Sequence, residues 1–381
     1  MKLKKIIRDE FAFLFKGKFP IALYFFIVPI LFSVLFSMVY AQNSVKHIPL
    51  VIFDQENSAI SRQLVQIYND SEKFTIVDYV PDQESFEEDL ATNKALVGLS
   101  IPPDFTKKVE LGDASNLLLV VNSTNNLFGN VALMYSKQMN QTFSIAISQK
   151  LFEAGGILPS QSMNLVYPIH MGLRVLNNPV TGYKPFMLPG LMLNGLQIGI
   201  LLAVGPLLVR EYKSKKYGKE YSSLSLLIGK TIPSWILAVL SYVVSMTVLF
   251  FIMDLQIAHK VIELLAIGIA FSFFVIQAMF FFSSISVDEV FSLQVPLVYL
   301  MPGLLFSGLT WPDFLMTSFG KFFSSLLPIS YAAVNLRSVL FSESDPFLWR
   351  DVSYMLLFGL LAAAVTLKIF SFRRKKSYVK G

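Results

Sequence analysis

The sequence contains no cysteine and few charged residues. Among its 381 residues there is no Cys, and Asp, Glu, Lys and Arg together make up 15%, whereas soluble proteins carry about 25%. The lack of Cys excludes disulfide bonds, thiolate zinc sites and a cysteine nucleophile. The scarcity of charge, with a hydrophobic share of 54% that includes 35 Phe residues, is typical of a protein that crosses a membrane several times.

Complete catalytic and nucleotide-binding motifs are also missing from the sequence. Gly229-Lys230-Thr231 resembles the end of a phosphate-binding P-loop, but Leu224 stands where that motif needs its first glycine. We interpret the stretch as a helix entering the membrane, with Lys230 reaching the headgroups. There is no G-x-S-x-G elbow, no G-x-G-x-x-G and no metal-binding spacing of histidines. We therefore expect no enzyme activity, no metal and no cofactor bound by this chain.

Six long apolar runs divide the sequence, and each has about the twenty residues that a helix needs to cross the bilayer core. The runs are 19–41, 187–209, 231–253, 261–282, 290–309 and 352–371. They predict an α-helical polytopic membrane protein with six transmembrane helices. No acidic or basic residue lies deep within a run, which argues against a proton- or sodium-driven transporter. Any driving force then comes from elsewhere, most simply from a separate ATPase.

Lys and Arg are concentrated in three segments. Six fall within residues 1–18, six between Arg210 and Lys230, and six between Lys368 and Lys380. By the positive-inside rule, both termini and the 210–230 segment are cytoplasmic, which suits a multi-pass protein of a bacterial plasma membrane. The net charge of +6 then faces membrane lipid and cytosolic partners, so we expect no nucleic-acid binding.

The segments outside the apolar runs have patterns of their own. Residues 1–18 interleave basic and apolar side chains, as an amphipathic interfacial helix does, and residues 372–381 form a basic tail. Residues 42–184 alternate strand-like and helix-like stretches, which predicts an inserted extracytoplasmic α/β domain. We expect strands at 47–54, 74–80, 95–101 and 116–122, and helices at 57–69, 82–93, 102–112 and 126–152.

Residues 185–371 should hold transmembrane helices two to six and one irregular outer segment. That segment, at about 311–350, is rich in Phe, Leu and Pro, and its prolines predict two short helices forming a re-entrant hairpin. Within the second run, Gly195, Gly199 and Ala203 allow another helix to approach closely. Amide side chains in the runs either join helices or line a substrate path; they are Asn194, Gln197, Gln277 and Gln294.

Several motifs, taken in order, resemble those of type-2 permease subunits of ATP-binding-cassette (ABC) exporters. The resemblance is to the branch with a large extracytoplasmic domain between the first two spans, and it extends over nearly the whole chain. The motifs are Asn178-Pro179 followed by FMLPGLM, Arg210-Glu211, IGKTIPSW, Ser286-Val287-Asp288-Glu289, MPGLLFSGLTWP and LLPISYAAVNLR. The last two supply an outer re-entrant motif of Pro302, Gly303, Pro328, Tyr331 and Arg337. The loop REYKSKKYGKEY departs from the family pattern, with Lys219 where Thr is usual, which leaves the register of its coupling helix open.

The resemblance implies a dimeric subunit that exports an amphipathic, lipid-like or drug-like substrate. ATP and Mg would be bound by separate ABC ATPase subunits, and the second permease would be an identical or a sister chain. The ATPase would dock on the 210–229 loop, where Tyr212, Tyr217 and Tyr221 offer anchors. The docking residues would be Arg210, Glu211, Tyr212, Lys213, Gly218, Lys219 and Glu220. Two alternatives stay open: a receptor or sensor whose outer domain binds a ligand, and an ABC-linked complex that transmits force without conducting cargo.

Overall fold

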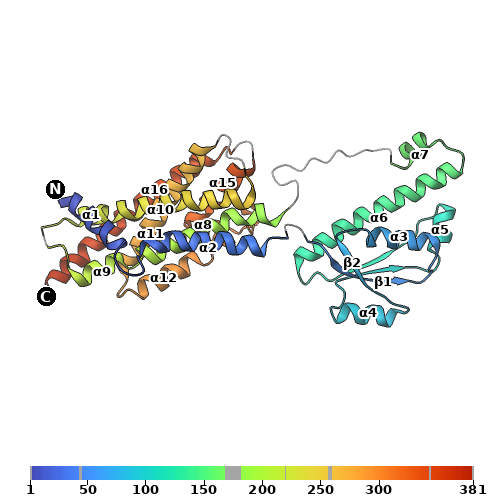
Figure 1. Cartoon of the computed structure of the whole chain (residues 1–381), viewed down its shortest axis with the longest axis horizontal. Coiled ribbons are helices and arrows are strands. Elements are labelled where there is room, and N and C mark those ends of the chain that lie inside the picture. Colours follow the sequence, from blue (N-terminus) through green and yellow to red (C-terminus); the bar gives the residue numbers. More distant parts are fainter. Residues whose placement is uncertain are drawn as a thin grey trace. The chain divides into compact units, whose positions relative to one another are not determined.

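The computed structural model describes two compact units. One consists of residues 45–167 and contains a sheet flanked by helices; the other contains helices alone (Figure 1). The residues described are 2–42, 45–167, 182–218, 220–255, 260–342 and 345–379. The Asn178-Pro179 motif lies outside them.

The unit of residues 45–167 is built on a four-stranded mixed sheet in the order β2-β1-β3-β4. β1 pairs in parallel with β2 and β3, and β4 runs antiparallel to β3. Parallel neighbours need crossover connections, which the helices between the strands supply. The predicted alternation of strands and helices is therefore confirmed, while the position of this unit outside the membrane stays a prediction. The strands are β1 (Ile48–Asp54), β2 (Phe74–Tyr79), β3 (Val97–Ile101) and β4 (Leu118–Val121).

Helices cover both faces of this sheet. On one face, the ring of Tyr68 is buried with strand residues such as Leu50 and Leu99. On the other face, Phe86 packs against Val51 and closes a smaller core. The first face carries α3 (Ala59–Asn69), α5 (Phe105–Leu111) and α6 (Asn126–Ala154), the second carries α4 (Gln83–Ala91), and α7 (Pro159–Val166) follows α6.

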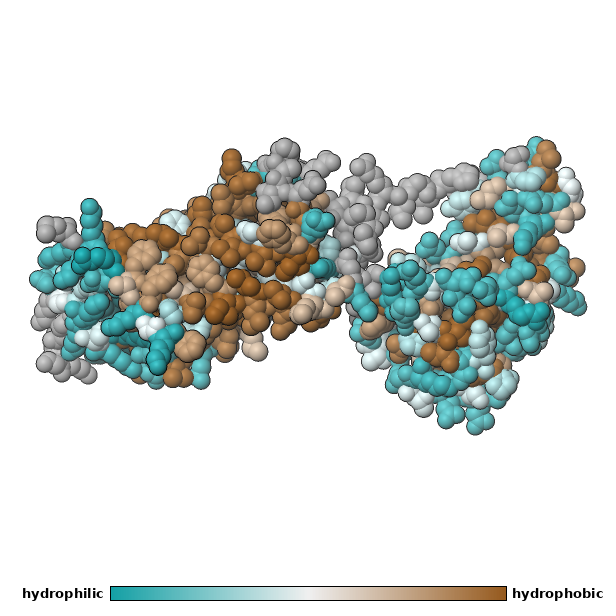
Figure 2. All heavy atoms as spheres, viewed as in Figure 1, coloured by the Kyte–Doolittle hydropathy of each residue, from teal (hydrophilic) through white to brown (hydrophobic). Residues whose placement is uncertain are grey.

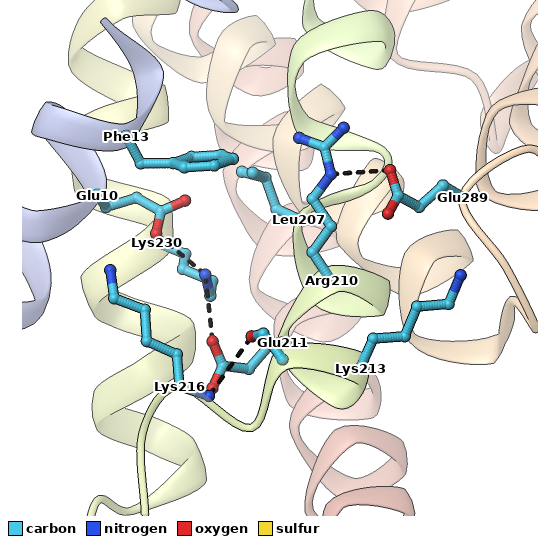
Figure 3. Close-up of a pocket in the computed structure, with 10 residues that line it drawn as sticks. Glu10, Phe13, Leu207, Arg210, Glu211, Lys213, Lys216, Lys230 and Glu289 are labelled. Atoms are coloured by element: carbon cyan, nitrogen blue, oxygen red, sulfur yellow. Dashed lines mark hydrogen bonds and ion pairs between the residues drawn. The ribbon is translucent and has the colours of Figure 1, made fainter. Parts of the chain in front are cut away.

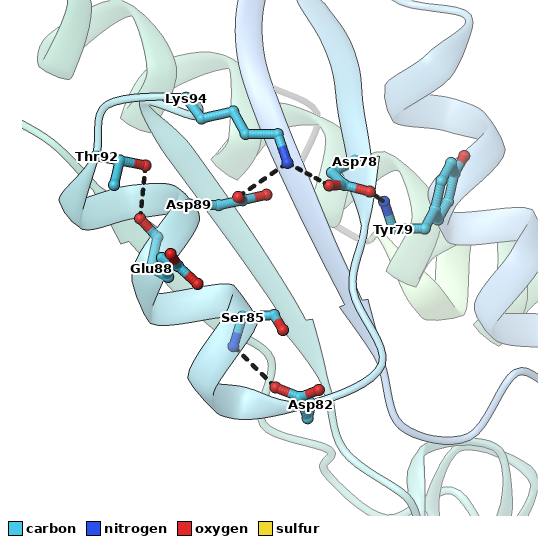
Figure 4. A network of polar contacts seen from close by, with 8 residues as sticks. All are labelled: Asp78, Tyr79, Asp82, Ser85, Glu88, Asp89, Thr92 and Lys94. Atoms are coloured by element: carbon cyan, nitrogen blue, oxygen red, sulfur yellow. Dashed lines mark hydrogen bonds and ion pairs between the residues drawn. The ribbon is translucent and has the colours of Figure 1, made fainter.

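A polar network joins α4 to the edge strand β2 (Figure 4). Lys94 Nζ lies 2.5 Å from Asp78 Oδ2 and 3.0 Å from Asp89 Oδ1. The hydrogen bond from Lys94 is the main cause that lowers the pKa of Asp78, and the same bond raises the pKa of Lys94. Both side chains reach solvent, so the network contributes modestly to stability.

This network predicts a pH-dependent stabilisation of β2. Because folding lowers the pKa of Asp78, its contribution is present above the unfolded value of about 4 and is lost as pH falls through the folded value. Because folding raises the pKa of Lys94, its contribution is present below about 10.4 and is lost as pH rises through the folded value. We expect Lys94→Gln to speed hydrogen–deuterium exchange of β2 at about pH 7 and to change nothing at about pH 2. Lys107→Gln, an exposed lysine on α5, is the matched control, and equal acceleration by Lys94→Gln at both pH values would contradict the assignment.

The helical unit contains five helices that are long and apolar enough to cross a membrane. Apolar residues cover the visible face of these helices, and hydrophilic residues gather at the end that holds α1, α9 and the C-terminus (Figures 1 and 2). The five are α2 (Ala22–Val39), α8 (Tyr183–Val204) continued by α9 (Leu207–Ser214), α10 (Ser223–Met253), α11 (Val261–Ile285) and α16 (Leu348–Val379).

The predicted run 290–309 does not form one long helix. It is divided between α12 (Phe291–Leu300) and α13 (Gly303–Phe306), and Pro302 stands between them. A proline donates no backbone hydrogen bond and clashes with the preceding turn, so it interrupts a helix. The multi-pass architecture is therefore established, whereas a count of six spans stays a prediction.

The outer segment at 311–350 contains the expected pair of short helices. They are α14 (Ser318–Ser325) and α15 (Pro328–Phe341), preceded by a 3-10 turn at Asp313–Leu315. Pro328 occupies the first turn of α15, where its missing N–H costs nothing. The Phe306 carbonyl at the end of α13 accepts hydrogen bonds from Ser324 (2.7 Å) and Ser330 (3.1 Å). The two helices are thus fastened to α13, and their entry into the membrane stays a prediction.

The small residues of the second run bring α8 against α2. A Cβ atom on Gly199 would lie 2.6 Å from the carbonyl oxygen of Tyr24, and one on Gly195 would lie 2.9 Å from the Cα of Pro29. Contacts this short leave no room for a side chain at either position. The spacing of four therefore has a packing role, as membrane helices with close backbones require.

Candidate functional site

A buried ion-pair cluster joins three segments that are distant in the sequence. Lys230 Nζ, on α10, lies 3.0 Å from Glu10 Oε2 on α1 (Lys2–Leu14) and 3.6 Å from Glu211 Oε2 on α9 (Figure 3). Glu10 is 2% exposed, and Glu211 and Lys230 are each 5% exposed. We call these three residues the Glu10–Lys230–Glu211 cluster.

The local sequence explains why α1 packs on α10 here. The buried residues of α1 are Ile6, Glu10 and Leu14, which lie four apart and form one stripe along the helix. A Cβ atom on Gly229 would lie 2.4 Å from Ile6 Cγ2, so the glycine makes the room that Ile6 occupies. The N-terminal helix has the expected amphipathic stripe, which is buried against α10, while its position at the membrane interface stays a prediction.

The prediction that Lys230 reaches the headgroups is wrong. Helix α10 begins at Ser223, so Lys230 lies about two turns inside the helix rather than at its start. Its ammonium group is enclosed by α1 and α9 and pairs with two carboxylates. A buried ammonium requires such partners, because losing water without them is strongly unfavourable.

A cavity of about 430 Å³ lies beside the cluster and carries charges of both signs (Figure 3). On its wall, Arg210 Nε donates to Glu289 Oε2 at 2.8 Å, and the Arg210 guanidinium lies 5.7 Å from the ring centre of Phe13. Two exposed lysines, Lys213 and Lys216, contribute to the lining. The cavity therefore brings together predicted docking residues and partners from α1 and the 286–289 motif. It is lined by Glu10, Phe13, Leu207, Arg210, Glu211, Lys213, Ser214, Lys216, Lys230 and Glu289.

The loop that follows α9 is held by Arg374 of α16. Its Nη1 donates to the Tyr221 carbonyl at 2.5 Å, and its Nη2 donates to the carbonyls of Tyr217 and Gly218 at 3.1 and 2.8 Å. Lys2 of α1 donates to the carbonyl of Glu220 at 3.0 Å. Four loop carbonyls are thereby satisfied by side chains, which fixes the loop to both terminal helices.

The expectation that the tyrosines of this loop offer anchors to a partner is wrong for Tyr217 and Tyr221. Tyr217 and Tyr221 are 3% and 9% exposed and pack on each other with ring centres 5.2 Å apart. Tyr212 packs on Phe370 of α16 at 5.3 Å. The rings of Tyr217 and Tyr221 are therefore covered by the chain itself, whereas Tyr212 stays half-buried. Of the predicted docking residues, Glu211 is buried, Arg210 and Tyr212 are half-buried, Lys219 lies outside the described residues, and those exposed are Lys213, Gly218 and Glu220.

The amides of the apolar runs are placed differently from one another. Gln197 is fully buried and donates to Asn194 Oδ1, one turn earlier on α8, at 2.7 Å. Gln277 of α11 donates to Thr231 Oγ1 of α10 at 3.2 Å, so it joins two helices. Gln294 lies exposed on α12.

Four of the five residues of the outer motif lie close together where α13 meets the start of α15, and Arg337 lies apart from them. A Cβ atom on Gly303 would lie 3.1 Å from Ile329, the neighbour of Pro328, so these two segments meet closely next to Pro302. The Tyr331 hydroxyl donates to the Ser325 carbonyl at 2.8 Å and closes the turn between α14 and α15. The remaining member, Arg337, lies almost two turns further along α15, against the ring of Phe186.

Sequence reasoning missed Glu10 and Arg374 as parts of the site. Glu10 carried a usable signal, because a carboxylate on the apolar stripe of an amphipathic helix needs a buried partner. No such signal marked Arg374, because it lies within a run of four basic residues and nothing in the sequence distinguishes it from the other three. Across the described residues, no group of three or more His, Cys, Asp or Glu could hold a metal ion.

Comparison with known proteins gives consistent matches over nearly the whole chain. A family described as "ABC-2 family transporter protein" matches residues 21–368. Over 315 residues the chain is 22% identical to the probable multidrug ABC transporter permease YbhR of Escherichia coli strain K12, and the match covers 82% of each chain. The protein of the same description from Escherichia coli O157:H7 matches equally.

Proposed function

The chain belongs to the ABC-2 family of transporter proteins, and we propose that it is the permease of an ATP-driven exporter that works as a dimer. Family membership makes it a transporter membrane subunit that associates with ABC ATPase subunits. Outward direction, dimeric assembly and an amphipathic or drug-like substrate belong to the proposal. The substrate class is supported by the multidrug description of the relatives.

The observation that carries the proposal is the Glu10–Lys230–Glu211 cluster with the loop beside it. α1, α9 and α10 are tied together by buried ion pairs, and α16 is tied to the same loop through Arg374. A force applied to the loop would therefore reach four helices at once. Of these, α10 and α16 are candidate spans, and α9 is the end of another. This is the arrangement that a docking site for a separate motor subunit requires.

Placement of the docking surface follows from exposure and charge. Lys213 and Lys216 are exposed members of the cavity lining, whereas Glu10 and Glu211 are buried in the cluster (Figure 3). An ATPase would thus meet a basic rim, and the loop would face the cytoplasm. Gly229 and Lys230 are engaged by α1, which supports nucleotide binding on the partner chain instead.

We expect the double change Lys213→Glu and Lys216→Glu to weaken association with the cognate ABC ATPase subunit about tenfold. Reversing rim charges lowers the rate of association and changes its salt dependence. Co-purification from detergent extracts over a series of salt concentrations measures this. Lys16→Glu, another exposed lysine outside the cavity, is the control and should leave association unchanged. If the double variant recovered as much ATPase as the wild type, with the same salt dependence, the docking assignment would be refuted. If the unaltered protein bound no ATPase at all, the exporter proposal itself would be refuted.

A further inference from the structure

A second cavity lies at the other end of the candidate spans, between the first turn of α8 and the second half of α15. Its volume is about 260 Å³, several times the roughly 30 Å³ that one water occupies in the liquid. Apolar and hydroxyl side chains line it around one arginine. The lining residues are Pro185, Phe186, Val334, Arg337, Ser338, Phe341 and Ser342.

The hydrogen-bonding capacity of the Arg337 guanidinium is not fully used within the protein. Its Nη1 atom is buried and has no hydrogen-bond partner. The guanidinium lies 4.8 Å from the ring centre of Phe186, a contact that fixes its plane without satisfying its N–H groups. It forms no ion pair with any carboxylate of the described residues. A buried guanidinium donor without an acceptor is unfavourable, so the site fits an anionic ligand.

A second cation strengthens the positive potential at this cavity. Lys260 Nζ donates to the carbonyls of Val339 at 3.1 Å and of Ser342, and Ser342 lines the cavity. Phe186, Val334 and Phe341 contribute apolar surface to the same lining. The site therefore offers both a cation for an anionic group and apolar surface for an adjoining hydrocarbon group.

The surroundings indicate where the anion comes from. Trp311 and Trp349, two of the three tryptophans of the chain, are 53% and 55% exposed and flank the segment that holds α14 and α15. Exposed tryptophans gather at the depth of lipid headgroups. A phosphate group also matches the fork of donors that a guanidinium presents.

We propose that this cavity binds the phosphate group of a membrane lipid or lipid-like amphiphile. Arg337 is the principal contact and donates to two phosphate oxygens, Lys260 supplies long-range attraction, and the apolar wall holds the part of the ligand next to the phosphate. The site stands whether the bound amphiphile is carried across the membrane or remains in place, so it does not depend on the exporter proposal.

The test is lipid binding by the full-length protein in detergent, read out by native mass spectrometry. Three probes are compared: phosphatidic acid, diacylglycerol with the same chains but no phosphate, and soluble glycerol 3-phosphate. We expect phosphatidic acid to bind and the other two to bind at least tenfold more weakly. Equal binding of diacylglycerol would overturn the proposal, and glycerol 3-phosphate binding as tightly as phosphatidic acid would replace the lipid by a soluble phosphate ester.

Variants assign the binding to Arg337. We expect Arg337→Gln to weaken phosphatidic acid binding about ten- to hundredfold and Arg337→Lys to weaken it less, because the single ammonium keeps the charge but not the fork. Lys321→Gln, which removes an exposed charge on α14, is the control. Val334→Phe fills the cavity without altering the charge and should also abolish binding, so it decides the matter if Arg337→Gln does not fold. Unchanged binding in Arg337→Gln or in Val334→Phe would refute the site.

Discussion

Replacing Lys230 by Met is expected to destabilise the helical unit by about 3–5 kcal/mol. The substitution leaves Glu10 and Glu211 facing each other across the space of the removed ammonium, which lies 3.0 and 3.6 Å from their carboxylates. Both carboxylates are at most 5% exposed and would have to ionise without a cation or take up protons. Unfolding of the full chain in micelles by increasing fractions of denaturing detergent measures the loss.

Three further variants separate the ion pairs from the bulk of the side chain. Lys213→Met removes an exposed lysine of α9 and should alter stability by less than about 0.5 kcal/mol. The exchange Glu10→Lys with Lys230→Glu keeps one cation and two anions but moves the cation from the centre of the cluster to one side, where it pairs with position 230 alone, so it should recover only part of the loss. Replacing all three cluster residues by Met should recover most of it, since apolar groups of similar volume often substitute well for buried ion pairs. A Lys230→Met variant as stable as the wild type would show that the cluster contributes nothing.

The parts of the fold that the sequence predicted well depend on local patterns. The strands and helices of residues 45–167 follow the alternation of apolar and polar stretches, because each element buries one face against its immediate neighbours. The five long apolar helices follow from length and hydropathy alone. The run at 290–309 was predicted as one span because of its length. Pro302, followed by a glycine in the second half of the run, already indicated that a continuous helix would be interrupted there.

The candidate site was harder to predict because its partners are far apart in the chain. Glu10 and Lys230 are separated by 220 positions, and no spacing rule links them. Tyr217 and Tyr221 show a second limit, since an aromatic residue in a basic loop suits a partner's surface or the chain's own interior equally well. In the structure both tyrosines lie in the interior, because Arg374 and α1 hold their loop in place. The charge pattern had connected the basic residues of these two segments with membrane orientation alone.

Adding one methyl group at Gly199 is expected to destabilise the helical unit by about 2 kcal/mol. The new Cβ atom of Gly199→Ala would lie 2.6 Å from the carbonyl oxygen of Tyr24. That atom belongs to the backbone of α2, so no side-chain rotation relieves the contact and the two helices must separate. Membrane helices associate through close packing rather than through the hydrophobic effect, so separation weakens the whole α2–α8 interface. Unfolding in micelles of increasing denaturing-detergent content again measures the change.

Gly320→Ala distinguishes packing from helix propensity in this prediction. Alanine is favoured over glycine inside a helix by about 1 kcal/mol, so propensity alone would make both substitutions stabilising. At Gly320 of α14 the nearest atoms to a new Cβ are 3.4 to 3.6 Å away, which is ordinary contact, and we expect no loss there. A loss at Gly199 combined with no loss at Gly320 can then come only from the approach of α2. If Gly199→Ala were as stable as Gly320→Ala, the backbones of α2 and α8 would have to lie further apart than the structure has them.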